Sequence, residues 1–253
     1  MEARFFTDCG NVRKHNEDAG GIFLNAHNQS LMIVADGMGG HQAGDVASDM
    51  ATSMIRDLWE DTEYFHAPEA IEAWLQDVLT DMNTAIYEKS QNNEAFQGMG
   101  TTVVIAVFID GLVSIAHIGD SRCYILNHNG FNQLTQDHSL VSALVRSGQI
   151  TEEDARHHPR KNVVLKALGT EANVHADIQT LSWEKGDRLL LCSDGLSDKI
   201  TNDELALWLQ KNTDHDEIGQ QLIDLANERG GEDNISLIIV YNDLDGKEGE
   251  SSC

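Results

Sequence analysis

Two apolar segments, far apart in the chain, lead into the same dipeptide. Residues 31–35 are followed by Asp36 and Gly37, and the apolar run 189–192 is followed, after one serine, by Asp194 and Gly195. Short apolar runs of this kind are typical of buried strands. Since strand ends lie on a rigid scaffold at the rim of a sheet, carboxylates there are well placed to build a site. Two such carboxylates indicate oxygen ligands for a hard cation such as Mg²⁺ or Mn²⁺.

Length and charge limit the domain count and the class of partner. The 253 residues suit one large domain, and neither a low-complexity linker nor an internal repeat divides them. We expect one catalytic domain over residues 1–242 and a polar, disordered tail over residues 243–253. The formal net charge of −25 repels phosphate backbones and anionic lipid, so we expect neither nucleic acid nor a membrane as a partner.

Cysteine usage and the N-terminal residues favour the cytoplasm. The four cysteines, Cys9, Cys123, Cys192 and Cys253, form no close pairs and no metal-type spacing. Their pattern does not indicate disulfides, which favours a reducing compartment. The first eight residues lack the apolar core of a signal peptide, and no run of about 18 apolar residues exists.

The pattern of apolar residues predicts an α+β protein. We expect strands at residues 4–9, 21–25, 31–36, 101–109, 112–118, 122–127, 176–181, 187–192 and 235–241, and helices at residues 42–59, 68–91, 201–210 and 216–228. Asp110-Gly111 between two β-branched runs indicates a hairpin, and hence antiparallel pairing. Residues 139–169 hold a short helix and a polar stretch, which predicts a flap outside the main body.

Five short segments each combine an acid with glycine or asparagine beside an apolar run. They are Asn16-Glu17-Asp18, Asp36-Gly37-Met38-Gly39-Gly40-His41, Gly119-Asp120-Ser121-Arg122, Ser193-Asp194-Gly195 and Gly231-Glu232-Asp233-Asn234. Taken alone, an aspartate-glycine pair is more often a turn than a ligand, and the Gly119–Arg122 segment is uninformative. Four or five acids that converge would not all stay ionised, because two carboxylates about 4 Å apart repel by roughly 4 kcal/mol at an effective dielectric constant of 20. A converging set therefore indicates a cation site.

Taken together and in this order, the five segments resemble the metal-dependent serine/threonine protein phosphatases of type 2C, in their compact bacterial form. The resemblance runs from Thr7 to Val240. It implies a central antiparallel sandwich of two sheets flanked by helices, four layers in all, with the metal centre at one end. It also implies hydrolysis of phosphoserine and phosphothreonine in proteins, by a hydroxide held between two Mn²⁺ or Mg²⁺ ions, in a pathway that opposes a bacterial serine/threonine kinase.

The resemblance assigns the ligands of the two main ions. Asp36 is expected to bridge both ions, and the carbonyl of Gly37 to bind one of them. Asp194 and Asp233 are expected to complete the other. A ligand set made only of oxygen selects manganese or magnesium over zinc, which prefers nitrogen and sulfur.

Further roles follow from the same resemblance. Asp18 is expected to hold water bound to the ions, with Glu17 a candidate beside it, and to count among the metal-site residues. Asp120, together with Asp194, is expected to bind a third, weaker ion. Arg13 is expected to grip the substrate phosphate by charge-assisted hydrogen bonds.

The sequence departs from animal members of this family after the first aspartate-glycine pair. They carry a histidine there as a proposed leaving-group acid, whereas this chain carries Met38, and the nearest histidine is His41. His41 either protonates the departing serine or threonine oxygen, or orients water on the ions, or merely caps the helix that begins beside it. Sequence alone leaves these alternatives open.

The sequence is also compatible with other functions and with other roles for the flap. The flap carries Arg146, Arg156, Arg160 and Lys161, which either attract phosphopeptides or are ordinary solvated surface. A pseudophosphatase or phosphoprotein-binding module would hold metal without turnover, although the complete set of aspartates argues against it. A hydrolase of small phosphate esters would show similar motifs without a preference for proteins. We expect a monomer.

Overall fold

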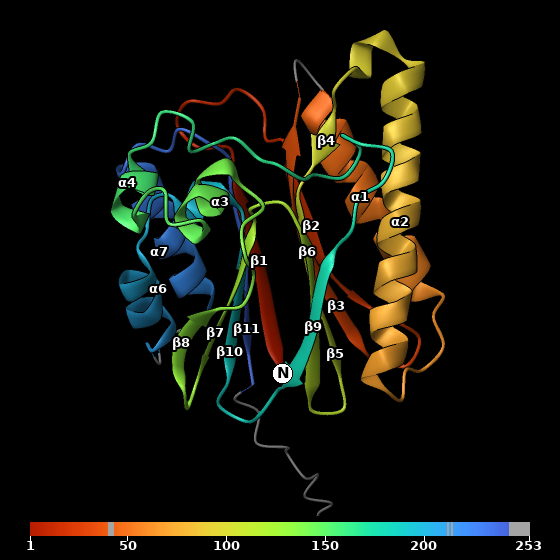
Figure 1. The fold of residues 1–253 in the computed structure, drawn as a ribbon. Helices are drawn as coiled ribbons and strands as arrows, with labels where there is room; N and C mark the ends of the chain where they lie inside the picture. The colour runs from red at the N-terminus through yellow and green to blue at the C-terminus, as the bar shows by residue number, and fades with distance from the viewer. Residues whose placement is uncertain (40–42, 212, 214, 243–253) are drawn as a thin grey trace, which may run out of the picture.

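The sequence folds into a sandwich of two antiparallel sheets with helices over both outer faces, seen edge-on in Figure 1. The computed structural model describes residues 1–39, 43–211, 213 and 215–242. The predicted α+β fold is confirmed. The predicted tail, residues 243–253, lies outside the described residues.

The strands divide between the two sheets in an order that mixes distant parts of the chain. The first sheet runs β1 (Glu2–Asp8), β11 (Ile235–Tyr241), β10 (Arg188–Cys192), β7 (Arg122–Asn127) and β8 (Gly130–Gln133). The second sheet runs β2 (Asp18–Leu24), β3 (Ser30–Met38), β5 (Val103–Ile109), β6 (Leu112–Ile118) and β9 (Asp177–Ser182), and the short β4 (Gly100–Thr101) pairs with β3. The strand pairings within the described residues are antiparallel.

The helices close the two outer faces of the sandwich. The second sheet is covered by α1 (Ala43–Glu60) and α2 (Pro68–Asn92), which is followed by a turn of 3₁₀ helix, η1 (Glu94–Phe96). The first sheet is covered by α6 (Asn202–Leu209) and α7 (His215–Glu228), with the short α5 (Asp194–Ser197) directly after β10. Two further short helices, α3 (Leu140–Arg146) and α4 (Glu152–Arg156), lie in the flap.

Alternation of side chains along each strand explains why the runs are apolar throughout. In β3, Met32 and Val34 pack into the core between the sheets, whereas Leu31 and Ile33 pack under the helices of the second sheet. Successive strand residues point to opposite faces, and both faces are covered here, so every position needs an apolar side chain. The strand ends are therefore the first places where polar side chains reach water.

Two local features differ from the sequence-based expectation, and a third agrees with it. Strand β3 continues through Gly37 and Met38, because these two residues pair with Thr101 and Gly100 of β4. Strand β8 was not predicted, since residues 130–133 lack an apolar pattern, and it forms by pairing with β7. The hairpin at Asp110-Gly111 is confirmed, and both residues have the positive φ values that such a turn requires.

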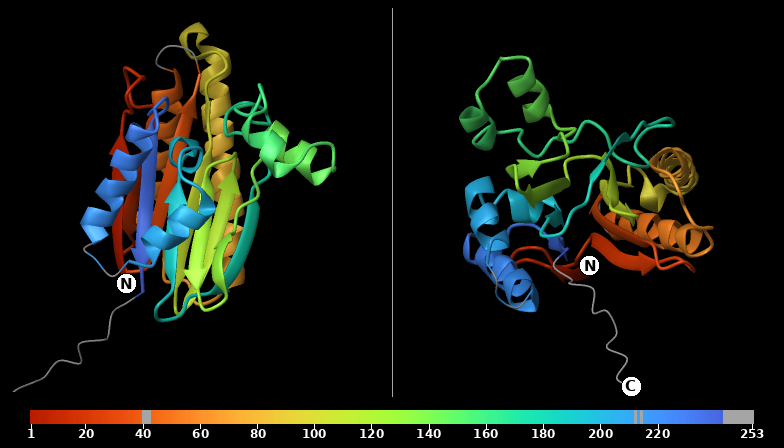
Figure 2. Two further views of the ribbon diagram at one scale, coloured as in Figure 1. Left: turned by 90° about the vertical axis from the view of Figure 1, so that its left-hand side faces the viewer. Right: turned by 90° about the horizontal axis from the view of Figure 1, so that it is seen from below.

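The predicted flap leaves the sandwich near one end and returns to it. It projects from the body as a separate lobe in Figure 2. An isolated bridge between Ser139 and Val164 closes its base, and the amide of Leu165 donates a 2.7 Å hydrogen bond to the carbonyl of His138. No helix among the described residues is both long and apolar enough to span a bilayer.

Candidate metal centre

Two of the predicted acids lie on neighbouring strands, directly opposite each other. Asp18 opens β2 and pairs in register with Asp36 of β3. Like charges that face each other across an antiparallel pair destabilise it. The ladder therefore places two carboxylates where only a cation, or a proton, removes their repulsion.

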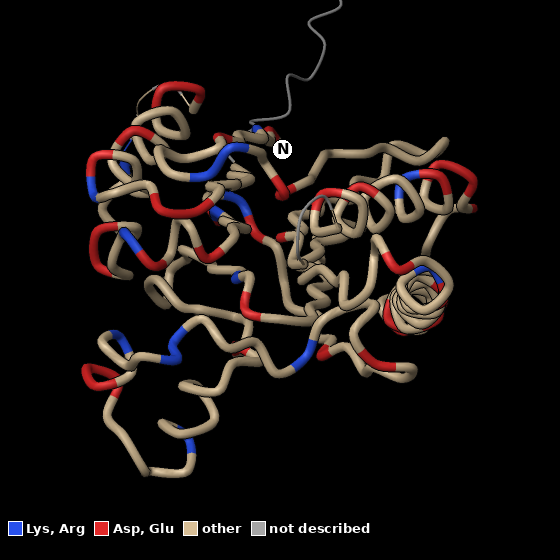
Figure 3. The backbone as a smooth tube through the Cα atoms, turned by 90° about the horizontal axis from the view of Figure 1, so that it is seen from above, with Lys and Arg blue, Asp and Glu red and all other residues tan. Residues whose placement is uncertain are grey.

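Three further acids reach the same end of the sandwich from other segments. Asp120 lies in the turn between β6 and β7, Asp194 is the first residue of α5, and Asp233 lies just before β11. Together with Asp36 they line one pocket of about 440 Å³. Figure 3 looks down on this end of the molecule, where acidic positions from several segments converge. The structure thus brings together the acids that the sequence predicts as ligands.

Burial and mutual repulsion raise the pKa values of these carboxyl groups. Burial is the largest cause in each case: it raises the pKa of Asp18 to about 7, of Asp120 to about 8 and of Asp194 to about 6. Burial also raises the pKa of Asp36 well above its ordinary value, and the charges of Asp18 and Asp194 add to the effect. Groups held this way ionise fully at neutral pH only when a cation neutralises them.

The donor set fits divalent metal ions. The Oδ1 atoms of Asp18 and Asp194 are buried without a hydrogen-bond partner, which is costly for a carboxylate unless something else binds it. Five carboxylates and Gly37 line the pocket, and among the described residues no cysteine or histidine lines it. Oxygen-only ligand sets of this kind suit magnesium and manganese.

The glycines that follow Asp36 and Asp194 are required by close packing of the backbone. A Cβ atom on Gly37 would lie 2.2 Å from the carbonyl oxygen of Gly44, and one on Gly195 would lie 2.0 Å from that of Asn234. Neither glycine has a positive φ. The aspartate-glycine pairs are therefore not simple turns; each glycine lets another segment approach the acid beside it.

Sequence reasoning missed the roles of the small polar residues that lock these segments together. Asn234 accepts a 2.8 Å hydrogen bond from the amide of Glu17 and donates to the carbonyls of Cys9 and His15, at 2.9 and 3.0 Å. Ser193 donates a 2.8 Å hydrogen bond to Oδ2 of Asp18. These residues connect the two sheets at the pocket. The sequence feature that could have indicated this role is that each of them lies next to a predicted metal ligand.

Asp36 itself is held by the strand that follows the second helix. The hydroxyl of Thr101 donates to the carbonyl of Asp36 at 2.9 Å, and the amide of Asp36 donates to Oγ1 of Thr102 at 3.2 Å. The hydroxyls of Thr102 and Ser121 lie 2.6 Å apart. Because both backbone groups of Asp36 are fixed, its carboxylate is held on a rigid element.

Arg13, the predicted phosphate ligand, lies at the mouth of the pocket. Its Nη2 atom is 2.8 Å from Oδ2 of Asp233, and its side chain is 48% exposed. Glu17 also lines the pocket, and burial raises its pKa, which the charge of Arg13 partly offsets. The guanidinium is thus close to the acids and open to solvent, where an incoming anion can reach it.

The base of the flap forms one wall of the pocket, through residues 162–164. A second hollow of about 770 Å³ adjoins it and shares Asp120 and Asp194. Of the four predicted flap cations, Arg146, Arg156 and Lys161 line this hollow and Arg160 does not. Lys161 forms an ion pair with Asp198 of the main body, and Arg146 donates to Oε1 of Gln136 at 2.8 Å.

His41, the predicted acid, lies outside the described residues.

Comparison with known proteins agrees with this geometry. The family model described as Protein phosphatase 2C matches residues 9–237. Serine/threonine phosphatase stp from Listeria monocytogenes is 46% identical over 252 residues, which cover 100% of both chains. The crystal structure of Stp1 from Staphylococcus aureus superposes with a TM-score of 0.89 at 41% identity and covers 94% of each chain. The catalytic domain of the phosphatase PstP in complex with 2 manganese ions gives a TM-score of 0.82 at 33% identity, over 94% of this chain and 96% of that one.

Proposed function

This chain belongs to the protein phosphatase 2C family, and from that premise we propose that its acidic pocket hydrolyses phosphoserine and phosphothreonine in proteins that a cognate kinase has phosphorylated. As a member of the family it is a metal-dependent serine/threonine phosphatase. The observation that supports the assignment to this pocket is the convergence of carboxylates on it, together with the buried Oδ1 atoms of Asp18 and Asp194, which have no hydrogen-bond partner among the described residues.

We assign the ligands as the sequence predicts them. Asp36 and the carbonyl of Gly37, with Asp194 and Asp233, would hold two Mn²⁺ or Mg²⁺ ions, and Asp120 would hold a third. When bound, such ions lower the pKa of water and draw charge from the phosphoryl oxygens. Asp18 would orient water at the site, since Ser193 fixes one of its oxygens and leaves the other free.

Arg13→Ala is expected to lower kcat/KM on a phosphothreonine peptide by about 10- to 100-fold, mainly through KM, because a hydrogen bond to a charged group is worth about 1.5–3 kcal/mol. Steady-state kinetics at saturating Mn²⁺ measure this effect. Lys14→Ala is the matched control, since Lys14 is an exposed cation next in the chain. Equal losses in both variants would show that only the overall charge matters, and would remove the phosphate-binding role of Arg13.

We propose His41 as the acid that protonates the departing serine or threonine oxygen. His41→Ala is then expected to lower kcat on a phosphothreonine peptide by about 10²-fold. It should change kcat on p-nitrophenyl phosphate little, because that leaving group needs no proton. Turnover of the peptide at the unaltered rate would leave His41 without this role.

The hollow beside the flap supports a substrate that is larger than a small phosphate ester. Arg146 and Arg156 are among the cations that line this hollow, and such charges attract acidic segments of a phosphoprotein. We propose that the polypeptide around the phosphorylated residue lies along this hollow.

The site is built from one chain, which fits a monomer. Cys123 and Cys192 are free and buried, which supports a reducing compartment such as the cytoplasm.

Initial rates on three substrates test the proposed function. With Mn²⁺ present, we expect rapid release of phosphate from a phosphothreonine peptide and slow release from a phosphotyrosine peptide and from a small sugar phosphate. A preference for the sugar phosphate would make the protein a small-ester hydrolase. Tight binding of the phosphothreonine peptide without release of phosphate would make it a binding module.

A further inference from the structure

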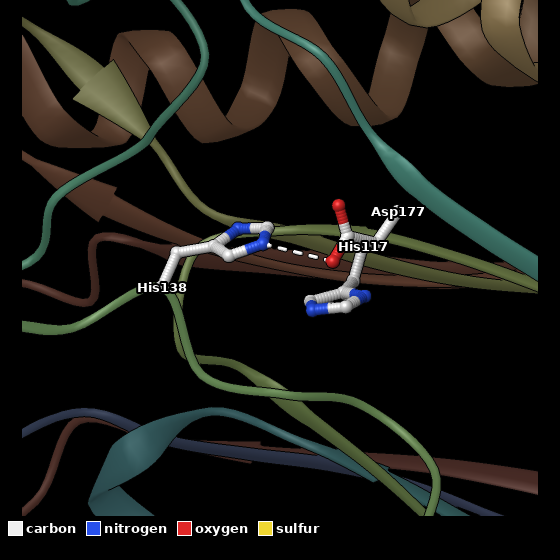
Figure 4. A group of neighbouring side chains, drawn as sticks. All are labelled: His117, His138 and Asp177. Carbon is white, nitrogen blue, oxygen red and sulfur yellow. Dashed lines mark ion pairs between the residues drawn. The ribbon is translucent and has the colours of Figure 1, made fainter. Parts of the chain in front are cut away.

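Two histidines and an aspartate form a cluster beside the turn that contains Gly119 and Asp120. His117 of β6 pairs in register with Asp177 of β9, and His138 comes from the loop that enters the flap (Figure 4). One ligand atom from each of the three residues lies within 4.8 Å of the others. The two rings stack with centroids 4.7 Å apart and an interplanar angle of 12°. Both histidines are buried.

The hydrogen bonds around His138 fix the position of its proton. The amide of Gly119 donates a 3.1 Å hydrogen bond to Nδ1 of His138, so Nδ1 carries a lone pair. In the neutral ring the proton is then on Nε2, which lies 3.3 Å from Oδ2 of Asp177. Burial lowers the pKa of His138, and this favours the neutral ring. Nε2 has no hydrogen-bond partner in the part of the chain that the structure describes, but the carboxylate of Asp177 lies close to it, and its charge favours the tautomer that is protonated on this nitrogen.

The same hydrogen bonds argue against a metal ion within the cluster. A metal on Nε2 of His138 would need the lone pair of that nitrogen while Nδ1 still accepts from Gly119, and a neutral imidazole has only one nitrogen lone pair to offer. Nε2 of His117 lies 3.0 Å from the carbonyl oxygen of Gln136, which places a proton on that nitrogen too. We therefore expect the cluster to act through hydrogen bonds and not by binding a metal ion.

The bonds of His138 hold the turn that carries Asp120. Besides accepting from Gly119 through Nδ1, His138 donates its own amide to the carbonyl of Gly119 at 2.9 Å. Gly119 has a φ of +111°, and a Cβ atom there would lie 2.5 Å from Cβ of Thr102. The turn is thus forced into a conformation that favours glycine, and His138 contributes a partner to both of its backbone groups. On the other side, the carbonyl of His138 holds Leu165 at the base of the flap.

We propose that His138 is a positioning residue for the third metal ion: its Nδ1 atom fixes the Gly119–Asp120 turn, and thereby the Asp120 carboxylate, while Asp177 holds the ring in the required tautomer. The metal part of this inference rests on the proposed role of Asp120. The hydrogen-bond part does not, because it concerns only atoms that this chain supplies.

Two substitutions of His138 separate its two nitrogens. In His138→Asn, Oδ1 takes the place of Nδ1 and accepts from Gly119, while the contact with Asp177 is lost. In His138→Gln, the side-chain amide nitrogen takes the place of Nε2, while the acceptor for Gly119 is lost. If only packing mattered, the smaller asparagine would be the worse replacement, because it leaves the larger cavity. The proposal predicts the opposite order.

The first measurement is hydrogen exchange of the Gly119 amide by NMR, in chelator-treated protein. We expect exchange in His138→Gln to be about tenfold faster than in the wild type, as for the loss of one hydrogen bond, and nearly unchanged in His138→Asn. The second is calorimetric titration with Mn²⁺. The weakest site should bind about tenfold more weakly in His138→Gln than in His138→Asn, and Asp120→Asn should abolish it.

Several outcomes would overturn the inference. Equal Gly119 exchange in His138→Gln and the wild type would remove the positioning role, and a larger effect in His138→Asn would reduce His138 to packing. A third ion that survives in Asp120→Asn but is lost in Asp177→Asn would be held by the histidine cluster itself. Failure of the proposed function would look different: the wild type would show no phosphatase activity, while the exchange of Gly119 would still report on His138.

Discussion

Asp36→Asn is expected to lower kcat on a phosphothreonine peptide by at least about 10³-fold while the fold is retained. The loss should be this large because the substitution removes the charge of the acid proposed to contact both ions, and the loss of even one preorganised electrostatic contact costs about 10²–10³-fold. The fold should survive because Thr101 and Thr102 bind the backbone of Asp36, not its carboxylate. Single-turnover and steady-state rates at saturating Mn²⁺ measure the effect.

Asp110→Asn is the matched control for this substitution. It makes the same chemical change in the turn between β5 and β6, at the opposite end of the sandwich, and asparagine tolerates the positive φ of that position. We expect its activity to match the wild type. If Asp36→Asn kept more than about a tenth of the wild-type kcat, Asp36 would not be a ligand that both ions share, and the arrangement of the centre would have to be assigned anew.

The acids of the pocket could be picked out from the sequence because each is marked by a local break in an apolar run. Asp36 ends the apolar run of β3, Asp194 comes shortly after β10, and Asp233 lies just before β11, so the local pattern places all three near strand ends. Their meeting at one end depends on strand order, which pairs β1 with β11 and β10 with β7. The resemblance to a family implied the two-sheet sandwich with its site at one end but not this strand order, and local patterns carry no information about pairing between strands so far apart.

The residues that could not be predicted act through contacts between distant segments. Asn234 holds the loop before β2 from a position more than two hundred residues later, and Ser193 reaches Asp18 from the other sheet. His138 stacks on His117 only because the chain turns back after β8. Asparagine, serine and histidine are common in loops, so their types give no hint of these partners; only the folded backbone does.

Removal of metal is expected to make the stability of the protein fall steeply as the pH rises. The carboxyl groups of Asp194, Asp18 and Asp120 have pKa values raised to about 6, 7 and 8, against about 3.9 in an unfolded chain. Between these limits the folded protein holds protons that the unfolded chain has released. Stability therefore falls with pH throughout this window, and the contribution of these protons is lost as the pH passes the raised values.

Other shifted groups do not reverse this slope. The pKa of Glu204 is lowered, mainly by a hydrogen bond from Arg229, to about 2, so its contribution is lost only in strong acid. The pKa of His138 is lowered by burial, which makes stability rise with pH up to about 6.5. This one group opposes five carboxyl groups with raised pKa values, counting Asp36 and Glu17. The net slope of the metal-free protein is therefore downward between about pH 5 and 8.

Thermal unfolding of chelator-treated protein measures this slope. We expect the Tm to fall by about 10 °C between pH 5 and 8.5, given shifts of several pKa units and about 2–4 °C per kcal/mol for a chain of this size. Saturating Mn²⁺ should raise the Tm at pH 8 by about 5–10 °C, since an ion at about a hundred times its Kd adds about 2.7 kcal/mol. It should also flatten the pH dependence, because the ions bind the ionised carboxylates.

Asp36→Asn connects this experiment to the loss of activity. The substitution removes one buried charge from the cluster, so the metal-free variant should have a higher Tm than the metal-free wild type at pH 8 and a shallower slope, although it is far less active. Asp110→Asn should follow the wild type in both respects. A metal-free wild type whose Tm is constant or rises between pH 5 and 8 would mean that the carboxylates do not repel one another in the folded state. The pocket would then lack the electrostatic repulsion that favours the binding of a cation by these acids.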